Sequence, residues 1–181
     1  MIERKQFEQG LDWNQYFNTY TEQQALHKHH FEKTEIAQGD RTILTKFDKL
    51  HILVLTVPWC GDSMATLPVL AKLVDGLDNV ELRFLERDDH PGIMDQYLTR
   101  GARAVPKIIF LDKDYHDLGS WGPRPAFIQN IFEENRSRIM AGEISKEQVH
   151  QILRKEYARD RGRSMVNEIV GILKAVLANA A

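Results

Sequence analysis

The stretch Trp59-Cys60-Gly61-Asp62-Ser63 contains the only cysteine of this 181-residue chain. An apolar run at residues 52–57 precedes it and predicts a buried strand, and an amphipathic segment at 64–73 follows it and predicts a helix. We therefore expect the thiol where a strand gives way to the first turn of a helix. Backbone N–H groups at that end of a helix lack partners within the helix and carry partial positive charge, so they stabilise a thiolate.

Three later segments have the composition of strands. Apolar and charged residues alternate at 80–86, residues 107–111 are largely apolar, and residues 115–121 follow them after a turn. Strands separated by helices favour parallel pairing with right-handed crossovers, and the last two strands should form an antiparallel hairpin. The sequence thus predicts an α/β fold with a mixed sheet of four to five strands flanked by helices.

Prolines and glycines mark the helices of this predicted core. Pro68 lies inside the helix that follows Cys60 and should kink it. A short helix is expected to begin at Pro91 and to end at Gly101, and a longer one to begin at Pro125.

Capping boxes predict further helices near both ends of the chain. Asp12 with Gln15 forms the first box, and Ser145 with Gln148 forms the second. Apolar residues at helical spacing follow the second box as far as Val176. Such stripes either pack against the core or form a homodimer through the C-terminal helices.

The composition is that of an ordinary soluble globular protein. Hydrophobic residues make up 43% and charged residues 28% of the chain, and the formal net charge is −2. This charge gives no strong attraction to nucleic acid or to an anionic membrane. The chain starts without the apolar run of a secretory signal, and a single cysteine excludes an internal disulfide. We expect a cytoplasmic protein, since thiols are kept reduced there.

The element order, with Trp-Cys-Gly-x-Ser after the first core strand, resembles the thioredoxin superfamily. Pro68 lies eight residues after Cys60, where that family kinks its active-site helix. Val105-Pro106 precedes the third core strand, where the family has a cis-proline opposite the cysteine, and Gly119 falls near the glycine that follows the family's last strand. The resemblance covers roughly residues 45–140.

This resemblance implies three parts of the chain. Residues 45–141 are expected to form a thioredoxin-like domain. Residues 1–44 should be an N-terminal helical extension packed on that core, and residues 142–181 a C-terminal helical extension.

The departures from the family pattern point to a monothiol protein. Thioredoxins carry Cys-Gly-Pro-Cys, whereas Asp62 stands here in place of the proline and Ser63 in place of the second cysteine. Val54 occupies the position of the family's buried aspartate, which is thought to help deprotonate that second cysteine. The two departures agree, because without a second cysteine the aspartate has no role.

A single thiol restricts the chemistry that Cys60 can perform. Its thiolate can attack a disulfide and form a mixed disulfide, which an external low-molecular-weight thiol must then resolve. Ser63 can donate a hydrogen bond to the sulfur but cannot resolve a disulfide. The expected substrates are oxidised or S-thiolated proteins, with the small thiol as co-substrate and no cofactor.

Other residues near Cys60 are expected to bind the substrate. The backbone at Val105 and Pro106 pairs with substrate in the family, and Trp59 offers an apolar surface. Gly61 and Asp62 belong to the same loop, and the Asp62 side chain is expected to point to water. Predicted catalytic residues are therefore Cys60 and Ser63, and predicted substrate-binding residues are Trp59, Gly61, Asp62, Val105 and Pro106.

Other functions and sites compete with this hypothesis. The chain can instead be a non-catalytic binding or chaperone module, or a redox sensor whose tail responds to oxidation of Cys60. His27, His29 and His30 are interpreted as a solvated helix end, since no acidic or sulfur ligands accompany them, and no metal is expected. Arg124 either holds a carboxylate of the small thiol or is a surface arginine.

Overall fold

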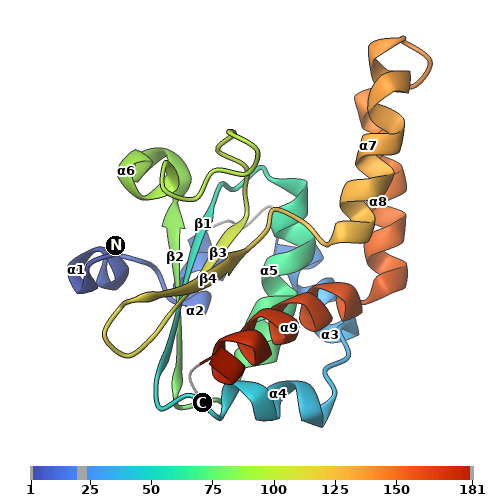
Figure 1. Cartoon of the computed structure of the whole chain (residues 1–181). Helices are drawn as coiled ribbons and strands as arrows, with labels where there is room; N and C mark the ends of the chain where they lie inside the picture. Colours follow the sequence, from blue (N-terminus) through green and yellow to red (C-terminus); the bar gives the residue numbers. More distant parts are fainter. Residues whose placement is uncertain (1, 20–23, 180–181) are drawn as a thin grey trace.

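A computed structural model describes residues 2–19 and 24–179, and a four-stranded sheet lies at its centre (Figure 1). The strand order is β2-β1-β3-β4, so β1 is flanked on both sides and is buried along its whole length. The strands are β1 (Leu50–Thr56), β2 (Val80–Glu86), β3 (Lys107–Leu111) and β4 (Asp117–Trp121). The predicted α/β class with a mixed sheet flanked by helices is confirmed.

The direction of β3 corrects the sequence prediction. β1 and β2 are parallel, but β3 runs antiparallel to β1 and to β4. The expected helix from Pro91 to Gly101 is only α6 (Pro91–Met94), which spans about 6 Å. A strand of seven residues spans about 23 Å, so α6 cannot carry the chain back across the sheet. The rest of the segment also stays at the edge where β2 ends, since Arg87 directly after β2 donates to the carbonyl of Arg103 shortly before β3. β3 therefore starts at that edge and runs the opposite way.

The two faces of the sheet bury different sets of side chains. Ile52 and Val54 point to the face covered by α5 (Gly61–Val74) and α9 (Arg163–Asn179). Leu53 and Leu55 alternate with them and point to the other face, where α6 and the N-terminal α1 (Arg4–Glu8) pack. A central strand buried on both faces explains the unbroken apolar run in the sequence.

Four helices precede β1 in the described part of the chain, where a capping box predicted the start of one. They are α1, α2 (Trp13–Thr19), α3 (Gln24–Lys33) and α4 (Gln38–Leu44). The Asp12–Gln15 capping box is confirmed, because each residue's backbone N–H donates to the other's side chain. α4 could not be predicted, because apolar residues recur only weakly at helical spacing in residues 31–50. Its one fully buried side chain is Leu44.

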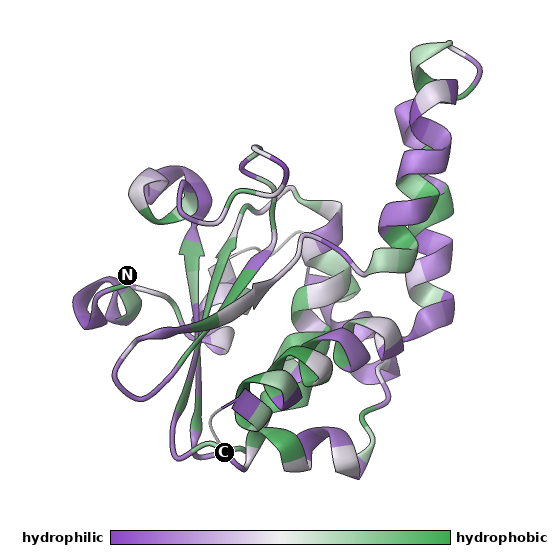
Figure 2. Ribbon diagram, viewed as in Figure 1, coloured by the Kyte–Doolittle hydropathy of each residue, from purple (hydrophilic) through white to green (hydrophobic). Residues whose placement is uncertain are grey.

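The C-terminal helices divide into a hairpin and a returning helix. α7 (Ala126–Met140) and α8 (Lys146–Asp160) lie side by side and project from the core (Figure 1). Their outward surfaces are largely hydrophilic, whereas α9 turns an apolar face to the sheet (Figure 2). The Ser145–Gln148 capping box at the start of α8 is confirmed. None of the helices in the described ranges is both long and apolar enough to span a bilayer.

Candidate functional site

Cys60 lies at the N-cap of α5, as the sequence predicts. Its backbone is extended and its carbonyl accepts a hydrogen bond of 3.0 Å from the N–H of Met64, which closes the first helical turn. The side chain is half-buried, and its Sγ donates to the carbonyl oxygen of Val105 across 3.2 Å. The thiol therefore faces the loop before β3, and the unpaired N–H groups of the first turn of α5 adjoin it.

The Val105–Pro106 peptide bond is cis. Gly122, which follows β4 with a φ of +121°, packs directly on the carbonyl group of Pro106. A Cβ atom at position 122 would overlap that carbonyl oxygen, so only glycine allows this approach. The glycine after the last strand is thus Gly122, and Gly119, which the sequence analysis put near that place, lies within β4.

Ser63 points into the core. Its side chain is buried, and its hydroxyl oxygen accepts a 2.8 Å hydrogen bond from the Thr56 hydroxyl at the end of β1. This bond ties the first turn of α5 to the strand that precedes it. The structure therefore places Ser63 beside Thr56, where its hydroxyl oxygen is engaged as an acceptor.

Asp62 does not point to water, which corrects the expectation from the sequence. Its Oδ1 accepts a 2.8 Å hydrogen bond from the hydroxyl of Tyr157 in α8, and its Oδ2 pairs with Arg124 across 2.5 Å. Both partners come from the segment after β4, so the C-terminal hairpin contacts the helix turn that carries Cys60. Only 12% of the Asp62 side chain is exposed, which makes these bonds stronger than surface pairs.

Burial raises the pKa of Tyr157 well above its ordinary value, and the charge of Asp62 and the hydrogen bond to it act in the same direction. Arg124 opposes this effect, and a Cys60 thiolate adds to it. Tyr157 is therefore a neutral hydrogen-bond donor at physiological pH, within electrostatic range of the sulfur.

Arg124 is held in place from two directions. Its guanidinium lies over the ring of Phe132 in α7, with 4.6 Å between the Cζ atom and the ring centroid. Glu168 of α9 accepts hydrogen bonds from the Trp121 indole (2.6 Å) and from the N–H of Ala126 (2.8 Å). The short segment between these donors carries Arg124, so α9 fixes its position.

A cavity of about 500 Å³ opens beside Cys60, between its loop and the hairpin. Trp59 forms one wall and is 65% exposed, which is high for an indole. Gly61 and Asp62 continue that wall along α5. The other lining residues come from four helices (α3, α5, α7 and α8) and from the segment before α7: Leu26, Met64, Arg124, Phe132, His150, Leu153, Arg154 and Tyr157.

Of the three histidines of α3, His29 is exposed, as the sequence suggested, but His27 does not belong to a solvated helix end. His27 is fully buried among Trp13, Tyr16 and Phe17, and neither ring nitrogen has a hydrogen-bond partner in the described part of the chain. Desolvation by burial, with a smaller contribution from the charge of His30, lowers the pKa of His27 to about 4.

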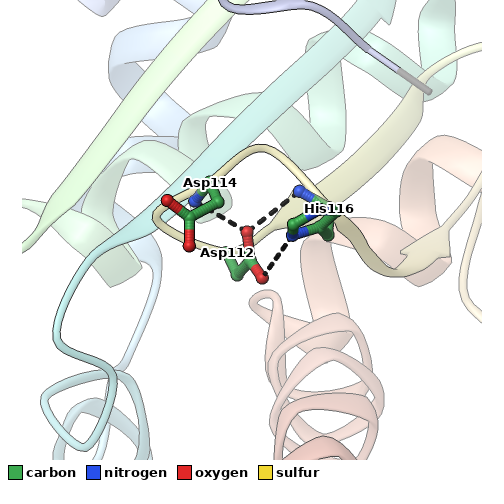
Figure 3. Close-up of side chains that lie close together, drawn as sticks. All are labelled: Asp112, Asp114 and His116. Carbon is green, nitrogen blue, oxygen red and sulfur yellow. Dashed lines mark hydrogen bonds and ion pairs between the residues drawn. The ribbon is translucent and has the colours of Figure 1, made fainter.

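A separate group of polar side chains lies in the β3–β4 turn (Figure 3). Potential ligand atoms of Asp112, Asp114 and His116 lie within 4.8 Å of one another. The Asp112 carboxylate accepts hydrogen bonds from the backbone N–H groups of Asp114 and His116, and its second oxygen lies 3.1 Å from His116 Nδ1. These bonds are those of a side chain that closes a turn, and they account for the cluster.

The structure thus brings Cys60, Trp59, Gly61, Val105 and Pro106 together, with Asp62 beside them. Sequence reasoning did not single out Tyr157, which lies in the apolar stripe after the second capping box, and it missed the cavity that the hairpin forms with Trp59. The polar hydroxyl of a tyrosine in that stripe was the only signal in the sequence.

Comparisons with known proteins agree with this geometry. The family model described as thioredoxin matches residues 10–137. A crystal structure of a protein of unknown function from Pseudomonas aeruginosa covers 100% of both chains at 18% identity, with a TM-score of 0.66.

A crystal structure of an HIV epitope scaffold covers 96% of this chain and 99% of its own, at 16% identity and a TM-score of 0.70. At these identities the two likenesses show the fold alone. No curated protein sequence shows a significant match. Because the family model spans well over half of the chain, the protein belongs to the thioredoxin family.

Proposed function

We propose that the protein is a monothiol thiol–disulfide oxidoreductase with Cys60 as its nucleophile. The observation that carries this proposal is the placement of the Cys60 sulfur, at the N-terminus of α5 and 3.2 Å from the carbonyl oxygen before cis-Pro106. The helix end supports an anionic sulfur, and the backbone at Val105 offers an edge to which an extended substrate can bind.

The reaction needs only one protein thiol and one small thiol. The Cys60 thiolate attacks the small-thiol sulfur of a mixed disulfide on a substrate protein. A bond forms between the two sulfurs, and the substrate thiol leaves as a thiolate that takes up a proton. A second small thiolate then attacks the small-thiol sulfur of the mixed disulfide on Cys60. The two small thiols leave as a symmetric disulfide, and Cys60 is released as a thiolate.

The chain itself contains no second cysteine to resolve the adduct. Ser63, which stands at that position of the motif, is buried and bonded to Thr56, and a hydroxyl cannot exchange with a disulfide. This absence supports an external low-molecular-weight thiol as the resolving agent.

Turnover with a protein that carries a small-thiol mixed disulfide tests the proposal. Reporter proteins modified with glutathione, bacillithiol or coenzyme A are incubated with the enzyme and an excess of the matching reduced thiol. We expect catalytic release of at least one of these groups by the wild type, and none above background by Cys60→Ala. Equal release by both proteins would refute the role of Cys60.

The exposed indole of Trp59 also supports a second function, that of a binding module without turnover. A module of that kind would retain its partner when Cys60 is replaced by Ala, because its affinity would depend on the surface around Trp59. An oxidoreductase would capture substrates as disulfides that Cys60→Ala cannot form.

A further inference from the structure

We propose that the cavity between Trp59 and the α7–α8 hairpin binds the carboxylate-bearing part of the small thiol that Cys60 exchanges. This inference rests on the proposed function, and it assigns the small-thiol substrate to a particular chemical class. It also gives the hairpin, which projects away from the sheet (Figure 1), a direct role at the site.

The cavity has the position that such a ligand requires. Trp59 and Gly61 line the cavity, and they are the residues directly before and after Cys60 in the chain. The wall of the cavity is therefore formed by the immediate neighbours of the nucleophile. The Sγ atom itself points toward Val105, on the side of the cis-proline loop. The two halves of a mixed disulfide can therefore occupy different surfaces, the protein half along the Val105 loop and the small thiol in the cavity.

The size and the walls of the cavity suit a small peptide-like molecule. A volume of about 500 Å³ lies within the usual range of ligand sites. The rings of Trp59, Phe132 and Tyr157 line it and offer flat apolar surfaces against methylene groups and peptide planes.

The charges in the lining favour an anion. Asp62 is the only carboxylate among the lining residues, and both of its oxygens are already bonded to Tyr157 and Arg124. Arg154 adds a second guanidinium, whose pairing with Glu147 is at the exposed surface and is therefore weak. The lining thus includes two guanidinium groups and a single carboxylate, which is already bonded.

Arg124 also has incomplete hydrogen bonding. Its Nη2 bonds to Asp62, but its Nε is buried and has no hydrogen-bond partner within the described ranges. A buried donor without an acceptor is costly, and a guanidinium matches a carboxylate in shape and charge. A ligand carboxylate that draws the Arg124 side chain toward the cavity supplies the acceptor that Nε, closed to solvent in this structure, lacks.

The test separates binding from chemistry by using an unreactive ligand. S-methylglutathione keeps both carboxylates but cannot form a disulfide, and it is titrated into Cys60→Ser while the indole N–H resonance of Trp59 is followed by NMR. Trp59→Phe in the same background assigns that resonance. We expect a saturable shift, and an affinity at least about tenfold lower for the ligand with both carboxylates esterified.

Two exposed arginines of α8 provide a matched pair of variants. Arg154 lines the cavity and pairs with Glu147, whereas Arg159 does not line it and pairs with Glu156. Arg154→Gln in the Cys60→Ser background should weaken binding of S-methylglutathione about fivefold, and Arg159→Gln should leave it unchanged. Absence of a saturable shift, equal binding of the ester, or equal effects of the two substitutions would overturn the inference.

The exchange assay of the proposed function distinguishes the two ways to fail. If the wild type releases small thiols from a reporter but Cys60→Ser does not bind S-methylglutathione, the cavity assignment is wrong and the function stands. If binding occurs as expected but the wild type releases nothing, the oxidoreductase function is wrong, and the cavity is a site for carboxylate-bearing ligands without turnover.

Discussion

The returning helix α9 and the α7–α8 hairpin follow one another in the chain but differ in what they bury. α9 places five side chains in the core over the sheet and α5: Met165, Val166, Ile169, Val170 and Leu173. The hairpin has a smaller apolar cluster that reaches only Ala65 of α5, and Tyr157 of α8 and Arg124 just before α7 bond to Asp62 beside Cys60. The comparison teaches that α9 completes the fold, whereas the hairpin shapes the surface around the thiol.

The largest expected effect comes from equal truncations in the two regions. Leu173→Ala in α9 removes a fully buried side chain from the main core and should lower the free energy of unfolding by about 2–5 kcal/mol. Leu153→Ala in α8 should cost less than half as much, because Leu153 lines the open cavity and the site can relax. Urea denaturation of both variants measures this, and equal losses would remove the distinction between the regions.

Acid should weaken the core through His27. The pKa of His27 is lowered to about 4 in the folded protein from 6.5, so the unfolded chain binds the proton first as pH falls. Stability is complete above about pH 6.5 and is lost progressively toward about pH 4, by at most about 3 kcal/mol.

His27→Leu tests this source of acid sensitivity. The free energy of unfolding of the variant should depend less steeply on pH between about 7 and 4 than that of the wild type. Parallel pH profiles for the two proteins would show that His27 is not responsible. The rings that surround His27 come from α2, so this effect tests a part of the core outside the two C-terminal regions.

The smallest expected effect concerns the bond between the hairpin and the Cys60 turn. Tyr157→Phe removes the hydroxyl that donates to Asp62 and should cost about 1–2 kcal/mol of local stability. Native-state hydrogen exchange should show faster exchange of the α8 amides, with little change in α9. Equal acceleration in both helices would mean that they unfold as one unit.

The sequence predicted the parts of the site that are close together in the motif or fixed by the family pattern. Cys60 at a strand-to-helix junction follows from the local change of periodicity, and the loop at Val105 and Pro106 follows from the resemblance. The antiparallel direction of β3 was missed, because it depends on how short α6 is, and no residue between Pro91 and Gly101 marks the end of that helix clearly.

The contact between Asp62 and Tyr157 could not be predicted from the sequence, for a different reason. The two residues are 95 positions apart, and their meeting depends on the length and direction of the whole hairpin. An aspartate in the first turn of a helix ordinarily faces solvent, where it favours the helix dipole. Only the fold shows that Tyr157 and Arg124, from a later segment, take the place of solvent around the Asp62 carboxylate.

The most direct test of the account is whether Cys60 itself accepts the small thiol. Reduced protein is mixed with a reporter protein that carries a glutathionyl mixed disulfide, the reaction is quenched with acid, and both intact masses are measured. We predict that the wild type gains one glutathionyl group as the reporter loses one, and that reduced glutathione then removes it. A reporter that keeps its modification, as it should with Cys60→Ala, would contradict the account.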